Sequence, residues 1–143
     1  MAADAGLVMA KLPQPVAAPE APQPQGHYSM AIRHGGIVYV SGQLPVRPDG
    51  SHTKDLPFEE QARQALRNLL AVLEGAGLGS QNLLKVTAYI VGVAHWPAFN
   101  AVYAQVMGES RPARSVVSVP ELHFGYLVEV DAVAADPLER RKS

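Results

Sequence analysis

The sequence predicts a two-layer α+β domain, with two helices on one face of a mixed sheet. Three observations indicate this fold class. The chain has 143 residues, which suits one domain with a sizeable core. Apolar residues recur at helical spacing in two stretches and have strand character in five others. Along the chain these read β-β-α-β-α-β-β, and right-handed crossovers through single helices place both helices on one face.

The first two predicted strands, 28–33 and 37–41, are joined by Gly35 and Gly36. Two glycines at a hairpin accept the positive φ that a tight turn needs. A loop rich in Pro, Asp, Gly and Ser follows at 45–57. The chain therefore opens with a hairpin and a long loop.

Two amphipathic helices and three further strands complete the order. Apolar residues recur at helical spacing over 58–73, with Gly75 and Gly77 placed to end that helix, and again over 96–106, ended by Gly108. The remaining strands are predicted at 84–91, 111–119 and 126–134.

The two ends of the chain are predicted to be tails. Five prolines lie between residues 13 and 24, so we expect residues 1–25 to be flexible and to avoid sheet pairing. Residues 137–143 read as a polar tail, which leaves 26–136 as the domain.

Composition narrows the classes of partner and site. The net charge of −1 provides no broad positive field for nucleic acid, and no apolar run is long enough to cross a membrane, so we expect a cytoplasmic protein. The chain has no cysteine, and its five histidines lack metal-ligand spacing. No metal site is predicted.

Alternation within each strand predicts which side chains share a face. Purely apolar sets are expected under the helices: Val38, Val40, Val86, Ala88, Ile90, Val117, Val119, Val128, Val130 and Ala132. The opposite, mixed sets are Tyr39, Ser41, Thr87, Tyr89, Arg114, Val116, Ser118, Glu129 and Asp131. No helix remains to cover this second face, so we expect it to pack on another subunit, with a small-molecule site in a cleft of that interface.

Arg114 and Glu129 fall together on the predicted uncovered face, on consecutive strands. Two interpretations are open. The pair forms a structural salt bridge, or the guanidinium binds an anion while the glutamate handles a proton or a water beside it. Asp131 is a weaker candidate for either role.

Six short segments resemble the RidA/YjgF family of reactive-intermediate deaminases, and the resemblance runs in order from residue 26 to 134. The segments are Gly26-His27-Tyr28-Ser29, Val40-Ser41-Gly42-Gln43-Leu44-Pro45, Gln61-Ala62-Arg63-Gln64, Phe99-Asn100-Ala101-Val102-Tyr103, Pro112-Ala113-Arg114-Ser115 and Leu127-Val128-Glu129-Val130.

The resemblance implies a chorismate-mutase-like fold, a homotrimer with sites between subunits, and no metal or organic cofactor. It implies hydrolysis of enamines and imines such as 2-aminoacrylate to 2-keto acids and ammonia. Arg114 would clamp the substrate carboxylate, and Glu129 would position or activate water. The family's remaining substrate-contacting positions correspond to Tyr28, Ser41, Gly42, Asn100 and Val116.

Departures from the family pattern bear on substrate identity. Val116 replaces a frequent cysteine that acts through its backbone carbonyl, Met30 replaces a frequent glutamine, and His123 and Phe124 replace a more usual proline and basic residue. One interpretation of these changes is that the substrate is a bulkier or more apolar imine. Two other functions remain open: an endoribonuclease or translation-inhibitor role, and non-catalytic binding of small carboxylates.

Overall fold

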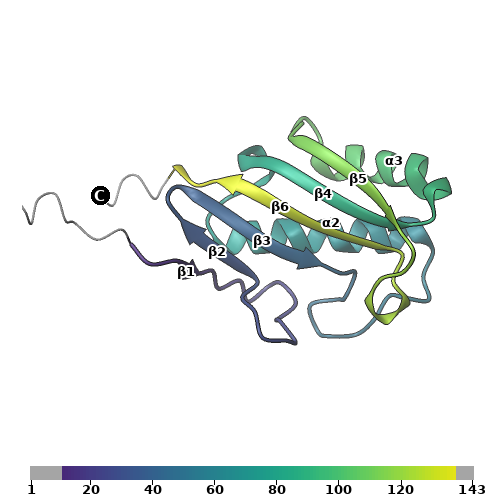
Figure 1. Cartoon of the computed structure of the whole chain (residues 1–143), viewed down its shortest axis with the longest axis horizontal. Coiled ribbons are helices and arrows are strands. Elements are labelled where there is room, and N and C mark those ends of the chain that lie inside the picture. The colour runs from purple at the N-terminus through teal and green to yellow at the C-terminus, as the bar shows by residue number, and fades with distance from the viewer. Residues whose placement is uncertain (1–10, 138–143) are drawn as a thin grey trace, which may run out of the picture.

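A computed structural model describes residues 11–137, which form two helices packed on one mixed sheet (Figure 1). The α+β prediction is confirmed, and one short strand precedes the predicted series. The elements are β1 (Gln14–Pro15), β2 (Ala31–His34), β3 (Ile37–Gln43), α2 (Phe58–Gly75), β4 (Leu83–Val91), α3 (Trp96–Met107), β5 (Ala113–Val119) and β6 (Val128–Ala135). Short 3₁₀ turns lie at Ser80–Asn82, Val93–His95 and His123–Gly125.

The sheet order is β1-β2-β3-β6-β4-β5, in which β4 and β5 are parallel and the other neighbours antiparallel. Both helices lie behind the sheet in Figure 1, and no other described element covers its front. One face is therefore core and the other is open. No helix within residues 11–137 is long and apolar enough to cross a membrane.

The core lies between the two helices and the covered face of the sheet. The fully buried side chains include Leu66, Leu69, Val72, Leu73, Val38, Val86, Ile90, Phe99, Val128 and Val130. Burying a side chain of this size contributes roughly 1.5–3 kcal/mol. The predicted turn chemistry also holds, because Gly35 and Gly36 have φ of 60° and 80°, and Gly108, which ends α3, has φ of 62°.

The predicted N-terminal tail needs correction for the part that the structure describes. Gln14 and Pro15 pair with Arg33 and Ile32 of β2, so this segment adds an edge strand. Beyond it, Val16, Ala18 and Ala21 are buried. Proline is tolerated there because an edge strand pairs on one side only. Residues 1–10 of that predicted tail, and 138–143 of the C-terminal one, lie outside the described residues.

An ion pair fastens β2 to the end of β6. Arg33 Nε donates to Asp136 Oδ2 at 2.6 Å, and Arg33 Nη2 donates to the carbonyl of Ala76, just after α2. The Arg33 side chain is 26% exposed and that of Asp136 only 1%. The pair therefore joins the sheet to the helix layer.

The face prediction was correct for β3, β4 and β6 but wrong for β5. Arg114 pairs with Val86 and Val116 with Ala88, and directly paired residues point to the same face. Since Val86 and Ala88 are fully buried under the helices, Arg114 and Val116 are on the covered side. Val117 is on the open side and remains 40% exposed.

Candidate active site

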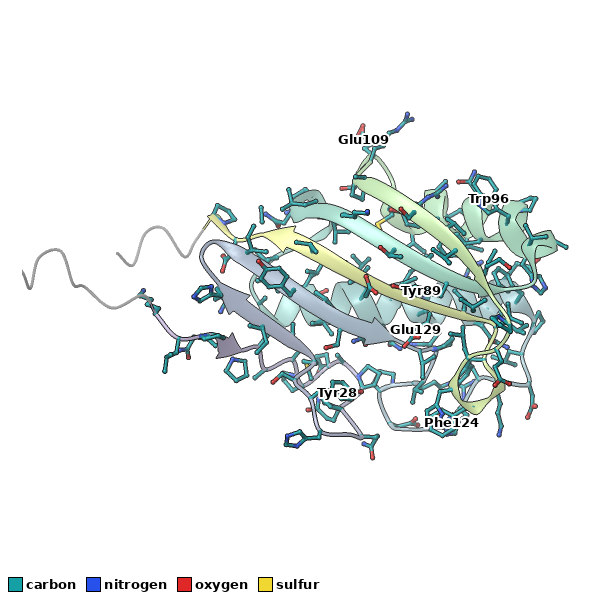
Figure 2. All side chains as sticks on the ribbon, in the orientation of Figure 1. Tyr28, Tyr89, Trp96, Glu109, Phe124 and Glu129 are labelled. Carbon is teal, nitrogen blue, oxygen red and sulfur yellow. The ribbon has the colours of Figure 1, made fainter. Side chains whose placement is uncertain are left out.

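A pocket of about 310 Å³ lies beside the first residues of β6. Its acidic side chain is that of Glu129, and its other lining residues come from distant parts of the chain. They are residues 22–26, Tyr28, Met30, residues 42–44, Val46, His123 and Phe124. Tyr28, Glu129 and Phe124 can be located in Figure 2, at the end of the sheet where β3 finishes and β6 begins. The pocket is thus mostly apolar around one acid.

A β-bulge places the Gly42 backbone directly against the Glu129 carboxylate. The register between β3 and β6 shifts between Val40 and Gln43. A Cβ added to Gly42 would lie 2.5 Å from Glu129 Oε2, closer than real Cβ contacts come. A side chain at this position would therefore force the Glu129 carboxylate to move.

The pKa of Glu129 is raised. Burial of the carboxyl is the largest cause, the negative charge of Asp131 adds to it, and His123 acts in the opposite direction. Asp131 itself accepts a hydrogen bond from Tyr89 Oη at 2.8 Å, which raises the pKa of Tyr89. A carboxyl with a raised pKa is suited to exchanging a proton with a substrate.

Ser41 positions the turn that carries Tyr28. Its Oγ donates to the carbonyl of Ser29 at 2.7 Å, and its backbone N–H donates to the carbonyl of Met30 at 2.9 Å. Tyr28 directly precedes Ser29 and lines the pocket, with 54% of its surface exposed.

Two buried amides on α2 hold the long loop that completes the pocket. Gln61 Nε2 donates to the carbonyls of Lys54 and Leu56, and Gln61 Oε1 accepts from the N–H of Leu127. Two turns further along α2, Asn68 Nδ2 donates to the carbonyls of Leu44 and Val46. Both amides are almost fully buried, so these bonds fix the loop on the helix.

Arg114 lies apart from this pocket, among side chains of α3. Its Nη1 donates to Asn100 Oδ1 at 3.0 Å. The guanidinium carbon lies 4.8 Å from the ring centroid of Tyr103, 5.5 Å from Trp96 and 6.0 Å from Phe99. Such contacts hold a guanidinium by cation–π attraction and restrict its orientation.

The hydroxyl of Tyr103 is buried and has no hydrogen-bond partner among the described residues. Burial raises its pKa, and the charge of Arg114 partly offsets that effect. Tyr103 therefore supports the guanidinium as a neutral ring.

Arg114 and Glu129 do not meet within one chain, and the prediction that they share the uncovered face was wrong. Glu129 pairs with Tyr89 on the open face, whereas Arg114 pairs with Val86 on the covered one. Strand β4 lies between their strands. Strand spacing and rise put the two Cα atoms roughly 14 Å apart. The salt-bridge interpretation is also wrong, because Arg114 bonds Asn100 instead.

The comparison with known families decides the relationship. A family model described as Endoribonuclease L-PSP matches residues 18–136. The chain belongs to the RidA/YjgF family. The recognition made from the six segments is thereby confirmed.

Relatives within the RidA/YjgF family are similar over most of their length. A RutC family protein from Pyrococcus horikoshii is 39% identical over 114 residues, which cover 80% of this chain and 90% of the relative. A Dermatophagoides farinae protein named 2-iminobutanoate/2-iminopropanoate deaminase is 35% identical over 118 residues, covering 82% and 92%. The crystal structure of E. coli TdcF with bound serine superposes with a TM-score of 0.81 at 30% identity, covering 85% and 98%.

The predicted site residues of this RidA/YjgF member separate into two groups. Tyr28, Gly42 and Glu129 meet in the pocket, with Ser41 directly behind it. Arg114 and Asn100 meet on α3 and β5. Val116 joins neither group through its side chain, which packs against the core.

Sequence reasoning missed several parts of the site. Residues 22–25 line the pocket but had been placed in the tail, and the aromatic residues around Arg114 had been used only as part of the helical pattern over 96–106. Their helical spacing from Asn100 was the available signal for the aromatic group. Within residues 11–137, no three His, Asp or Glu side chains are grouped so as to hold a metal ion.

Proposed function

We propose that this protein hydrolyses reactive imines and enamines bearing an α-carboxylate, giving a 2-keto acid and ammonia. The observation that carries the proposal is a pair of incomplete sites within residues 11–137. Glu129 lies in a pocket whose lining contains no arginine or lysine, and Arg114 bonds Asn100 and no carboxylate. The relative named as an imine deaminase supports this reaction. So does the relative solved with serine, because serine carries the same carboxylate and α-nitrogen as an imino acid.

We further propose that a homotrimer brings the two groups together. In this arrangement Arg114 and Asn100 of one subunit close the Glu129 pocket of the next. The open sheet face, with Tyr39 half exposed and Val117 40% exposed, provides apolar surface for such packing.

In the proposed mechanism, Arg114 binds the substrate carboxylate through two charge-assisted hydrogen bonds. Asn100 holds the guanidinium in place, while Tyr28 and the Gly42 backbone border the imine. The fixed carboxylate orients the imine carbon toward a water beside Glu129.

Glu129 then takes a proton from that water while the water oxygen forms a bond to the imine carbon. The proton passes to the nitrogen, giving a tetrahedral carbinolamine. As the carbinolamine collapses, its hydroxyl proton passes to the nitrogen, the C=O bond forms and the C–N bond breaks, so ammonia leaves and the keto acid remains. An enamine enters the same route after protonation at carbon gives the imine.

The direct test generates the alanine-derived imine in situ with an amino-acid oxidase and follows keto-acid release. We expect acceleration by the purified protein, and a loss of about 10²-fold for Arg114→Ala because two charged hydrogen bonds disappear. Arg63→Ala is the matched control, since among the described residues its side chain bonds Gln105 alone, on the outer surface of the helices. Full activity of Arg114→Ala would contradict the assignment.

The description of the matching family as an endoribonuclease motivates one alternative, cleavage of RNA. A net charge of −1 offers little of the cationic surface that phosphate binding requires. We expect no RNA cleavage that depends on Arg114 and Glu129. Cleavage lost in both variants would favour the alternative, and keto-acid binding with no imine turnover would favour a non-catalytic carboxylate binder.

A further inference from the structure

The pocket lining combines one acid with polar side chains and a group of apolar side chains that we call the apolar wall. The Glu129 carboxylate lies against the Gly42 backbone, and the other polar lining side chains are those of Gln23, Gln25, Tyr28, Gln43 and His123. Met30, Leu44 and Phe124 belong to the apolar wall, together with Val46 and prolines 22 and 24. A substrate whose imine nitrogen lies at Glu129 therefore extends its side chain among apolar atoms.

Phe124 is the exposed aromatic residue of that wall. Its side chain is large and apolar but remains 46% exposed. Figure 2 labels it. Its backbone adopts φ 63° and ψ 7°, the left-handed conformation that a phenylalanine rarely takes. Unfavourable backbone conformations of this kind persist where the surrounding structure imposes them, often at ligand sites.

Three aromatic contacts hold the Phe124 ring in this position. The ring centroid lies 3.8 Å from that of His123, 4.8 Å from that of His52 and 6.3 Å from that of Tyr126. The left-handed turn therefore presents the ring at the pocket, where His123 also lies.

Tyr126 fixes His52 behind the Phe124 ring. The Tyr126 side chain is fully buried, and its hydroxyl accepts a hydrogen bond from the Thr53 N–H at 3.2 Å. The same hydroxyl forms a hydrogen bond of 2.6 Å with His52 Nδ1. Because Thr53 Oγ1 in turn donates to the carbonyl of Pro45, the support reaches across the loop and is rigid.

We propose that Phe124 is a specificity-determining residue that makes the site favour α-imino acids with a large apolar or aromatic side chain. This inference rests on the proposed deaminase function. An aromatic or branched side chain gains contact with the Phe124 ring and the Met30 and Leu44 side chains. A methyl side chain is too short to make those contacts, so the carboxylate and imine alone would hold the small substrate.

The test compares kcat/KM for two imines made in situ by an amino-acid oxidase, one from phenylalanine and one from alanine. Wild-type protein is expected to favour the phenylalanine-derived imine by about tenfold or more, the scale of a few methylene contacts in an apolar pocket. Phe124→Asn removes the ring but keeps a residue that accepts the left-handed backbone. It should lower the rate constant for the aromatic imine by about tenfold and that for the small imine by less than about threefold.

Two further variants serve as a replacement and a control. Phe124→Gly also suits the left-handed turn and replaces the asparagine variant if that one fails to fold. Leu56→Ala is the matched control, because Leu56 is a partly exposed apolar residue of the neighbouring loop that does not line the pocket. It should leave both rate constants unchanged.

The outcomes separate this inference from the proposed function. Hydrolysis of the small imine as well as, or better than, the aromatic one would overturn the inference and leave the deaminase function standing. Equal losses for both imines in the Phe124 variants would do the same. No hydrolysis of either imine by wild-type protein would overturn both.

Discussion

Mixing two inactive variants should restore activity if the active site is shared between subunits. Arg114 and Glu129 lie on opposite faces of one sheet with β4 between them, so no single chain can bring them to one substrate. Arg114→Ala and Glu129→Gln are each expected to lose about 10²-fold or more in kcat/KM, through the lost carboxylate clamp and the lost proton acceptor.

The recovered activity can be calculated from the arrangement of a closed ring. Each interface joins one face of a chain to the complementary face of the next. In an equal mixture, half of the chains keep Arg114 and the other half keep Glu129. An interface then contains both intact groups with a probability of one half times one half, so about a quarter of wild-type activity should return.

The assay is imine hydrolysis by oligomers assembled from the two variants co-expressed with different tags and purified through both tags in succession. Discarding the unmixed oligomers in this way can only increase the intact fraction. Mixed oligomers, verified by mass spectrometry, that stay near one hundredth of wild-type activity would refute the shared site. As a second measurement, an equal mixture of wild-type and double-variant chains should give about a quarter for a shared site, but about half for a site within one chain.

Three other changes test separate features. Gly42→Ala places a methyl group against the Glu129 carboxylate and should lower kcat by about 10–100-fold with little change in the urea midpoint; unchanged kcat would contradict the close approach. Burial raises the pKa of Glu129, and its ionised form must accept the proton, so kcat/KM should fall with decreasing pH at a value above the ordinary 4.5. His123→Ala should move this acid limb of the pH profile of kcat/KM to still higher pH, because His123 favours the ionised carboxylate. A limb that moves lower would show that His123 does not favour the carboxylate. Arg33→Ala leaves the Asp136 carboxylate buried without its cation and should reduce the free energy of unfolding by about 3 kcal/mol in urea titrations, whereas a loss below about 0.5 kcal/mol would contradict that pairing.

The sequence predicted the elements with strong periodicity because their signals are local. The helix starting at Phe58 and the hairpin at Gly35 and Gly36 each carry their own apolar spacing and turn residues. The pairing of Tyr28, Gly42 and Glu129 followed from the family segments, and the structure places all three in one pocket.

The facing of β5 could not be predicted in the same way. Both of its alternating sets contain valine, and the purely apolar one, Val117 and Val119, looked like the core set. Which set is buried depends on the register with β4, a contact between strands connected through α3. The consecutive strands that carry Arg114 and Glu129 are not neighbours either, since β4 lies between β5 and β6 in the sheet.

The N-terminal segment was predicted to be a flexible tail because it is rich in proline. Frequent proline does favour an extended chain, but an extended chain is also what an edge strand requires. Ala18 and Ala21 then fill small spaces in the core that a flexible tail would leave open.

The bonds from Gln61 and Asn68 to the pocket loop have a consequence for protein engineering. Each side-chain amide both donates and accepts hydrogen bonds. A carboxylate has no N–H to donate and an apolar residue can form neither bond, so no such residue of similar size can reproduce these contacts. A loop exchanged between relatives would lose its anchors unless the helix that carries them travelled with it. The loop and α2 thus form one transferable cassette, and chimaeras intended to alter substrate choice should cross over outside both.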